Sequence, residues 1–359
     1  MELGDKKNIR RWLVSARWDL LVFVTPVLIA VLFSIYWSEY SDTDRTPIWA
    51  FLLLIIAFDV SHVWASAYRT YFDTHEIRRR PLLYLGILPP CFIFSLLVHY
   101  YDPIIFWTII AYIALWHFVR QPYGFVAMYR LLRKEGNKID QWLDQLSIYV
   151  AALGPILAWH ASPERQFDWF GHNEQFILRI PEEYKLLIAT IYFGFALVYL
   201  VRQIYLILFT RAFNLGKQVI IGLTWVTWAL GIAISDPLIS AAFINLFHGI
   251  PFLAITWLYG HNKYQKGLLG SIFKTKNLQW FFLIVFIPAF LEEGLWDSIF
   301  WGQYSSIFPS LLIPNNNEFL LSFLCALLIM PQLVHYILDA FIWKMNSTNP
   351  DLRKYLGLL

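Results

Sequence analysis

Residues 236–260 read DPLISAAFINLFHGIPFLAITWLYG, and this stretch decides the class of fold. Past Asp236 it contains no lysine, arginine, aspartate or glutamate. A helix needs about 20 mostly apolar residues to cross the hydrocarbon core of a bilayer. The stretch therefore predicts a transmembrane helix, and this helix carries one histidine, His248, near its middle.

The rest of the chain has the same character. Among its 359 residues, the types A, V, I, L, M, F, W, Y and C make up 58%, and charged residues only 15%. A soluble domain has about 25% charged residues, so this composition excludes a soluble enzyme and a disordered chain. The two cysteines, Cys91 and Cys325, lie in apolar runs and predict no disulfide scaffold. We expect an all-α, polytopic integral membrane helical bundle that forms a single domain over residues 1–359.

Apolar runs of sufficient length predict about ten transmembrane helices. Their approximate bounds are 19–37, 48–67, 82–100, 103–121, 144–162, 185–208, 217–234, 236–260, 277–296 and 319–343. Ten spans place the two ends of the chain on the same side of the membrane.

The distribution of basic residues fits this count. Of the 28 lysines and arginines, 24 fall in the terminal segments or in the connections on their side. The opposite side has only Arg45, Arg165, Arg179 and Lys185. Cytoplasmic loops of membrane proteins carry an excess of Lys and Arg. We therefore expect cytosolic N- and C-termini in a multi-pass protein of a bacterial cytoplasmic (inner) membrane.

Four of the nine histidines lie well inside predicted spans, and they are His62, His117, His248 and His335. Ionisable groups at membrane depth are costly and mark functional sites. In the predicted topology all four lie in the cytosolic half of helices that run in the same direction. One histidine in a span is usually a helix–helix contact, but four at similar depth favour a shared metal site.

Three of these histidines have a carboxylate or amide on their own helix face. Asp59 precedes His62 by three residues and Asp339 follows His335 by four, which are spacings that bring side chains together. Such groups join the coordination of a metal or orient the imidazole through its other nitrogen. We expect these roles for Asp59 and Asp339. Asn245 has the same spacing from His248 and is expected to support it.

Four further charged residues have two interpretations each. Arg69 and Arg120 follow the histidine-bearing runs on the cytosolic side, where they could grip a carboxylate or phosphate headgroup or serve as membrane anchors. Glu292 and Glu293 lie near the outer end of the ninth span. We interpret them as interfacial, with a proton or cation path as the alternative.

Known catalytic motifs are missing, because no two histidines lie closer than eleven residues. The histidine clusters of membrane desaturases and the HExxH zinc motif are therefore absent. Imidazole with carboxylate fits iron best here, with zinc or copper possible. Ligands held one per helix are loosely similar to the bacterial membrane-bound β-carotene dioxygenases, in which histidines on several spans hold one iron. This likeness is architectural and rests on no local motif.

The sequence thus predicts a membrane-bound, metal-dependent oxidoreductase. We expect non-haem iron and O₂ to oxidise a lipid or isoprenoid substrate by hydroxylation, desaturation or cleavage. Membrane lipids and an apolar substrate are the expected partners, together with a separate electron donor, and no nucleic acid is expected. Three alternatives use the same residues: a zinc-dependent membrane lipid hydrolase, a proton-coupled transporter, and a bis-histidine haem protein.

Overall fold

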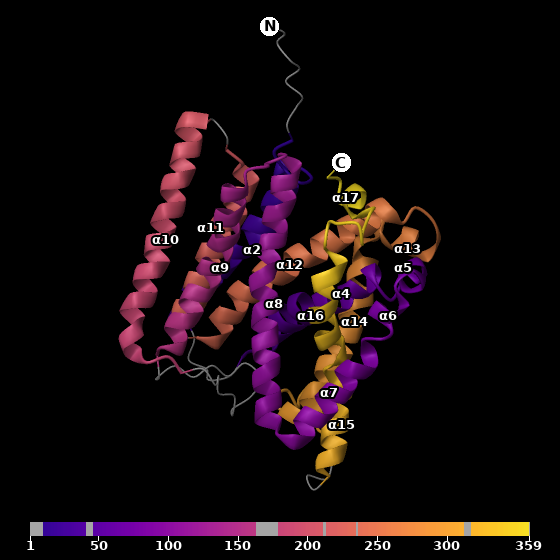
Figure 1. The fold of residues 1–359 in the computed structure, drawn as a ribbon. Helices are drawn as coiled ribbons and strands as arrows, with labels where there is room; N and C mark the ends of the chain where they lie inside the picture. The colour runs from indigo at the N-terminus through magenta and orange to yellow at the C-terminus, as the bar shows by residue number, and fades with distance from the viewer. Residues whose placement is uncertain are drawn as a thin grey trace.

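A computed structural model describes residues 10–40, 46–162, 179–210, 213–234, 236–311 and 317–358. The structure is 81% helical and has no strand in these ranges (Figure 1). The prediction of an all-α helical bundle is confirmed.

The helices are as follows, with π-helical and 3₁₀ segments labelled η: α1 (Ala16–Asp19), η1 (Leu20–Val24), α2 (Thr25–Tyr40), α3 (Ile48–Ala50), η2 (Phe51–Val60), α4 (Ser61–Arg69), α5 (Thr74–Arg79), α6 (Pro81–Tyr84), α7 (Leu88–Tyr101), α8 (Pro103–Leu132), α9 (Lys138–His160), η3 (Glu182–Tyr184), α10 (Lys185–Tyr205), η4 (Leu206–Thr210), α11 (Leu215–Ala233), α12 (Pro237–Lys263), α13 (Gly267–Ile272), η5 (Thr275–Asn277), α14 (Leu278–Trp296), η6 (Asp297–Trp301), α15 (Glu318–Leu328), α16 (Met330–Ile342) and α17 (Leu352–Tyr355). Several of these segments continue one another and form longer helices.

Eight continuous helices in the described residues are long and apolar enough to cross a membrane. The pair α15 and α16, bent by 42°, makes a ninth candidate. All nine coincide with predicted spans. The remaining prediction, 144–162, corresponds to α9, which is 23 residues long but is not among the apolar spans. The difference arises because α9 begins with polar residues, which lower its mean hydropathy. One of them, Asp144, is nevertheless buried in the bundle, where it accepts hydrogen bonds from Arg130 at 2.6 Å and Lys217 at 2.9 Å.

Aspartate–proline pairs set the start of two long helices. Asp236 caps α12, and its carboxylate accepts from the backbone N–H groups of Leu238 and Ile239. Asp102 caps α8 in the same way. In both helices the proline that follows occupies the first turn, where its missing N–H leaves no hydrogen bond unmade. Tight turns of this kind let consecutive long helices run back alongside each other.

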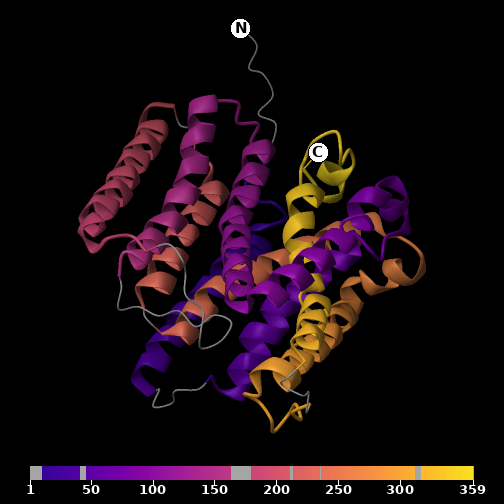
Figure 2. The same cartoon turned by 60° about the horizontal axis from the view of Figure 1, so that its bottom comes forward.

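Helix α12 forms the centre of the bundle, and α10 forms one edge (Figures 1 and 2). Of the 18 most apolar consecutive residues in Pro237–Lys263, 83% are buried, whereas the corresponding share in Glu182–Thr210 is 6%. Around α12 pack α2, η2, α4 and α11, whereas α10 packs mainly against α9. The central helix carries His248, so protein surrounds this histidine on every side.

The two ends of the described chain meet at one end of the bundle. The Arg10 guanidinium donates to the carbonyl of Gly357 at 2.6 Å. This contact places both ends at the same end of the bundle, which agrees with ten crossings when α9 is counted together with the nine apolar candidates.

Candidate metal centre

Four helices bring the four predicted histidines together. His62 lies on α4, His117 on α8, His248 on α12 and His335 on α16. One ring nitrogen of each lies within 4.8 Å of those of the other three, and all four side chains are buried. The group could hold a metal ion. Sequence reasoning found these residues from their depth along the predicted spans.

The four imidazole rings form a rough square, with the centroids of neighbouring rings 4.5 to 4.9 Å apart. The Nε2 atom of His248 lies 3.0 Å from that of His62 and 3.1 Å from that of His117, and the Nε2 atom of His335 lies 3.2 Å from that of His117. Rings that are neighbours around the square meet at 67° to 77°. The opposite rings of His62 and His117 are parallel to within 9°, with centroids 6.2 Å apart. The imidazoles therefore surround a common centre.

These spacings match ligands at right angles around one ion. Two nitrogens that each lie about 2.1 Å from a metal are about 3.0 Å apart at a right angle, and about 3.4 Å apart in a tetrahedron. The separations of 3.0 and 3.1 Å are closer to the first value, and that of 3.2 Å lies midway between the two. An ion held by all four histidines would therefore have a ligand arrangement nearer to a square than to a tetrahedron, with room for reactants above and below.

Hydrogen bonding among the histidines can account for only two of the three close Nε2 contacts at once. A neutral imidazole carries one proton on its two nitrogens, so each Nε2 either donates once or accepts. The Nε2 atom of His248 lies within 3.2 Å of two other histidine Nε2 atoms, and so does the Nε2 atom of His117. Nδ1 of His62 lies 3.3 Å from the Phe58 carbonyl, which can only accept. His62 therefore carries its proton on Nδ1 and presents a lone pair to the centre, as a metal ligand does.

Asp59 and Asp339 lie beside the histidine square. An Asp59 oxygen is 3.7 Å from Nδ1 of His62, and an Asp339 oxygen is 3.7 Å from Nδ1 of His335. The other Asp339 oxygen is 3.9 Å from Nε2 of His117. These distances exceed a direct hydrogen bond. Each carboxylate is nevertheless close enough to orient a ring, and Asp339 faces two of the four.

The expected support of His248 by Asn245 is not found. The Asn245 amide donates to the Leu54 carbonyl at 3.4 Å, and Nδ1 of His248 is buried without a hydrogen-bond partner among the described residues. The spacing of three residues placed the two side chains on adjacent parts of α12, but Asn245 faces η2 instead.

The two predicted arginines have different surroundings. Arg120 lines a cavity together with His117 and Asp339. Arg69 lines neither of the cavities described below and is only 2% exposed. One of its guanidinium nitrogens lies 3.3 Å from Glu76, and another donates to Asn349 at 3.1 Å. Its partners are therefore groups within the protein, which the sequence could not reveal.

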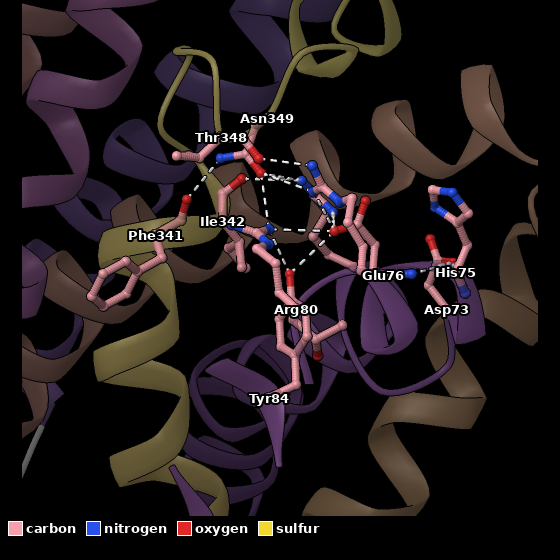
Figure 3. A network of polar contacts seen from close by, with 12 residues as sticks. Asp73, His75, Glu76, Arg80, Tyr84, Phe341, Ile342, Thr348 and Asn349 are labelled. Atoms are coloured by element: carbon pink, nitrogen blue, oxygen red, sulfur yellow. Dashed lines mark hydrogen bonds and ion pairs between the residues drawn. The ribbon is translucent and has the colours of Figure 1, made fainter. Parts of the chain in front are cut away.

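Those partners belong to a polar network that ties residues 69–84 to the C-terminal segment (Figure 3). The Glu76 carboxylate also contacts Arg79 at 2.6 Å and Arg80 at 3.3 Å. Burial opposes ionisation of Glu76, but the positive charges of Arg69, Arg79 and Lys263 outweigh it and lower its pKa to about 2. The network is thus held together by a carboxylate that remains ionised, and it lies apart from the histidines.

Two cavities lie near the four histidines. The first, which we call the outer cavity, has about 250 Å³ and extends from Thr46 and Gln303 to Asp59, and its lining includes none of the four histidines. The inner cavity, of about 230 Å³, is lined by His117 and by the residues Trp116, Arg120, Met128, Phe252, Ile255, Ile337, Asp339, Trp343 and Lys344, among others. Tyr336 lines both cavities. Such concave, largely apolar spaces beside a few polar groups are typical of ligand sites.

Sequence reasoning missed the aromatic residues around the histidines. The ring of Phe118 lies 4.5 Å from that of His248, and Tyr336 lies 4.9 Å from His117. Phe252 lies 5.3 Å from His62 and 5.2 Å from His335. Phe118 and Tyr336 directly follow a histidine, and this adjacency was the available signal. These rings shield the imidazoles from water.

The side chains of Glu292 and Glu293 are both buried within the bundle, and their interpretation as interfacial stays a prediction. Glu292 accepts a hydrogen bond from the Trp64 indole at 2.7 Å. Glu293 lines the outer cavity. Adjacent residues on a helix point in different directions, which explains their separate environments.

Comparisons with known proteins add no family to this description. No family model matches the chain, no curated protein matches it, and no solved structure matches it.

Proposed function

We propose that the protein is an integral membrane metalloenzyme that uses non-haem iron and O₂ to oxidise a lipid or isoprenoid substrate. The rough square of four buried imidazole rings carries this proposal. Imidazole is a ligand that suits iron, and an octahedral ion in this square keeps two positions for reactants. When bound, iron supplies the activation of O₂ and the oxidation of the substrate.

The number of histidines favours an oxidising metal over a hydrolytic zinc ion. Catalytic zinc sites usually have three protein ligands in a tetrahedron, with a water molecule in the fourth position. Four histidines would fill a tetrahedral site and leave no position for that water. Copper(II) shares the tetragonal preference of the square, so elemental analysis must distinguish copper from iron.

The surroundings favour a substrate that is soluble in lipid. The inner cavity reaches His117 between apolar and aromatic side chains, among them Trp116, Met128 and Phe252. These side chains would bind a hydrocarbon chain and exclude water from the metal centre. Arg120 lines the same cavity and would contact a polar end group. Electrons would come from a separate donor.

Metal analysis of the protein purified in detergent tests the proposal. We expect near-stoichiometric iron in the wild type. Replacing any one of the four histidines with alanine should lower metal affinity by about tenfold or more, since even outer-shell changes cost that much. His99→Ala is the matched control, because His99 is also buried but contacts Ser322 at 2.9 Å on the other side of the fold.

Three results would count against the proposal. Stoichiometric zinc would favour the lipid hydrolase. The absence of any metal with all four histidines intact would exclude both enzymes and favour the transporter. A haem absorbance band would indicate electron transfer.

A further inference from the structure

The two cavities differ in chemistry. Carboxylates line the outer cavity, namely those of Asp59, Glu293 and Asp297. The inner cavity has two cations, Arg120 and Lys344, against one carboxylate, Asp339. Positive charge beside a passage excludes protons, whereas buried carboxyl groups in membrane proteins commonly relay them. A route for protons to the metal centre is therefore more favourable through the outer cavity.

Glu293 has no hydrogen-bond partner in the described residues and, unlike Asp59, does not lie beside a histidine of the candidate site. Its side chain is only 9% exposed and lines the cavity. Asp297, one helical turn further along the chain at the start of η6, accepts hydrogen bonds from the backbone N–H groups of Gln303 at 2.8 Å and Tyr304 at 3.0 Å. An ionisable group buried without a partner is costly to keep, which indicates a functional role.

The position of Glu293 connects the two ends of the cavity. Glu293 lines the same cavity as Asp297, toward the outer loop, and Asp59, beside His62. Its neighbour Glu292 faces Trp64 instead. A carboxyl group free of hydrogen bonds can turn toward water on either side and pass on a proton.

We propose that the outer cavity conducts protons and water between the outer face and the metal centre, with Glu293 as the proton-transfer residue. This inference rests on the proposed function and narrows it. Glu293 gives its proton to water on the metal side of the cavity and takes another from water on the outer side. The exchange leaves the carboxyl group unchanged after each cycle.

The chemistry of O₂ shows which reactions need this route. Hydroxylation of a C–H bond takes one O₂, two electrons and two protons, and yields an alcohol and one water. Desaturation takes the same reactants, removes two hydrogen atoms from the substrate and yields two waters. Cleavage of a double bond by insertion of both oxygen atoms consumes no protons. The route therefore assigns the enzyme to hydroxylation or desaturation, with electrons from the separate donor.

The test uses the iron-loaded full chain in lipid vesicles, with a pH-sensitive dye on each side. Tetramethyl-p-phenylenediamine serves as the electron donor, because its oxidation releases no proton, and O₂ is the acceptor. Each electron that reaches O₂ then consumes one proton from one side of the membrane. For the wild type we expect this uptake on the side of residues 302–304, with vesicle orientation fixed by an N-terminal tag.

Glu293→Gln keeps the size of the side chain but cannot carry a proton, and we expect it to slow O₂ reduction by about a hundredfold. Glu293→Asp should restore much of the rate. Glu292→Gln is the matched control, since it removes a carboxyl group from the adjacent position and keeps an acceptor for Trp64. Its rate should equal that of the wild type, and metal content should be equal in all variants.

Two outcomes would overturn the inference while leaving the proposed function intact. One is a Glu293→Gln variant whose rate of O₂ reduction and side of proton uptake equal those of the wild type. The other is an equal loss of rate in Glu292→Gln. A wild-type protein that binds no metal would instead contradict the proposed function, and the inference would fall with it.

Discussion

The Glu76 carboxylate should contribute strongly to the stability of the polar network that ties residues 69–84 to the C-terminal segment. It contacts Arg69 at 3.3 Å and Arg79 at 2.6 Å, and Arg69 is fully enclosed. Glu76→Gln leaves a buried guanidinium without its charge partner, so the free energy of unfolding should fall by about 3–5 kcal/mol. Chemical unfolding in detergent measures this change. As a control, Glu182→Gln breaks the exposed pair with Lys185 and should cost less than about 1 kcal/mol.

The same carboxylate predicts a dependence of stability on pH. The pKa of Glu76 is about 2 in the folded protein, against 4.5 ordinarily. A lowered pKa stabilises the folded state fully above pH 4.5, and this contribution disappears as the pH falls toward 2. The difference in unfolding free energy between wild type and Glu76→Gln should therefore shrink between pH 5 and pH 3. A constant difference over that range would contradict the assignment.

Asp339 should tune the affinity of the metal centre, because it faces both His335 and His117. Asp339→Asn keeps the shape of the side chain but removes the charge that orients the rings. Metal affinity, measured by competition with a chelator, should fall by about 10–100-fold. Asp351→Asn changes an exposed carboxylate near the C-terminus and should leave affinity unchanged. Equal affinities in the two variants would exclude this role for Asp339.

Depth along a span is the residue-level property that the sequence reveals best. It was enough to select His62, His117, His248 and His335 from nine histidines. It could not identify the partners of a side chain across the bundle. Arg69 faces Glu76 and Asn349, and Glu293 faces a cavity, for reasons that lie in segments remote in sequence.

Among the helices, α12 depends on close contact with the segment that carries His62. A Cβ atom at Gly249 would lie 2.0 Å from the carbonyl oxygen of Phe58, the group that contacts Nδ1 of His62. Gly249→Ala should therefore push α12 away and disturb two metal ligands together. We expect about 1–3 kcal/mol of destabilisation, measured by unfolding, together with a loss of bound metal.

A second glycine provides the control for that prediction. Gly222 on α11 has nothing within 4 Å of an added Cβ atom. Gly222→Ala should stabilise the helix by about 0.5–1 kcal/mol, since glycine is a poor helix former. Equal responses at the two positions would show that the approach of α12 to Phe58 is not tight.

The predicted helix bounds failed where polar residues continue a helix or interrupt an apolar run. The fourth span was expected to end at residue 121, but α8 continues to Leu132 through Pro122. Helix α9 has the predicted place, yet its buried Asp144 lowers its apolar character. Hydrophobic runs locate helices well, but they give no information on charged residues that pair inside the bundle.

At the scale of the whole molecule, the charge distribution predicts cytosolic ends. A fluorescent protein fused after the C-terminus should fluoresce in the cytoplasm, and alkaline phosphatase inserted after residue 162 should be active outside it. The contact of Arg10 with Gly357 requires only that the two ends share a side. Active phosphatase at the C-terminus would reverse the predicted orientation.

Tyr336 lines both cavities, so the histidines lie near the place where the outer cavity, with its carboxylates, approaches the more apolar inner cavity. If the proposed function holds, the metal would act between a cavity with carboxylates and a cavity with mostly apolar side chains. An oxidised hydrocarbon would return to the inner cavity with its aromatic side chains, while the water formed with it would leave through the outer cavity with its carboxylates. The two products would leave through separate exits, and neither would have to clear the path of the other.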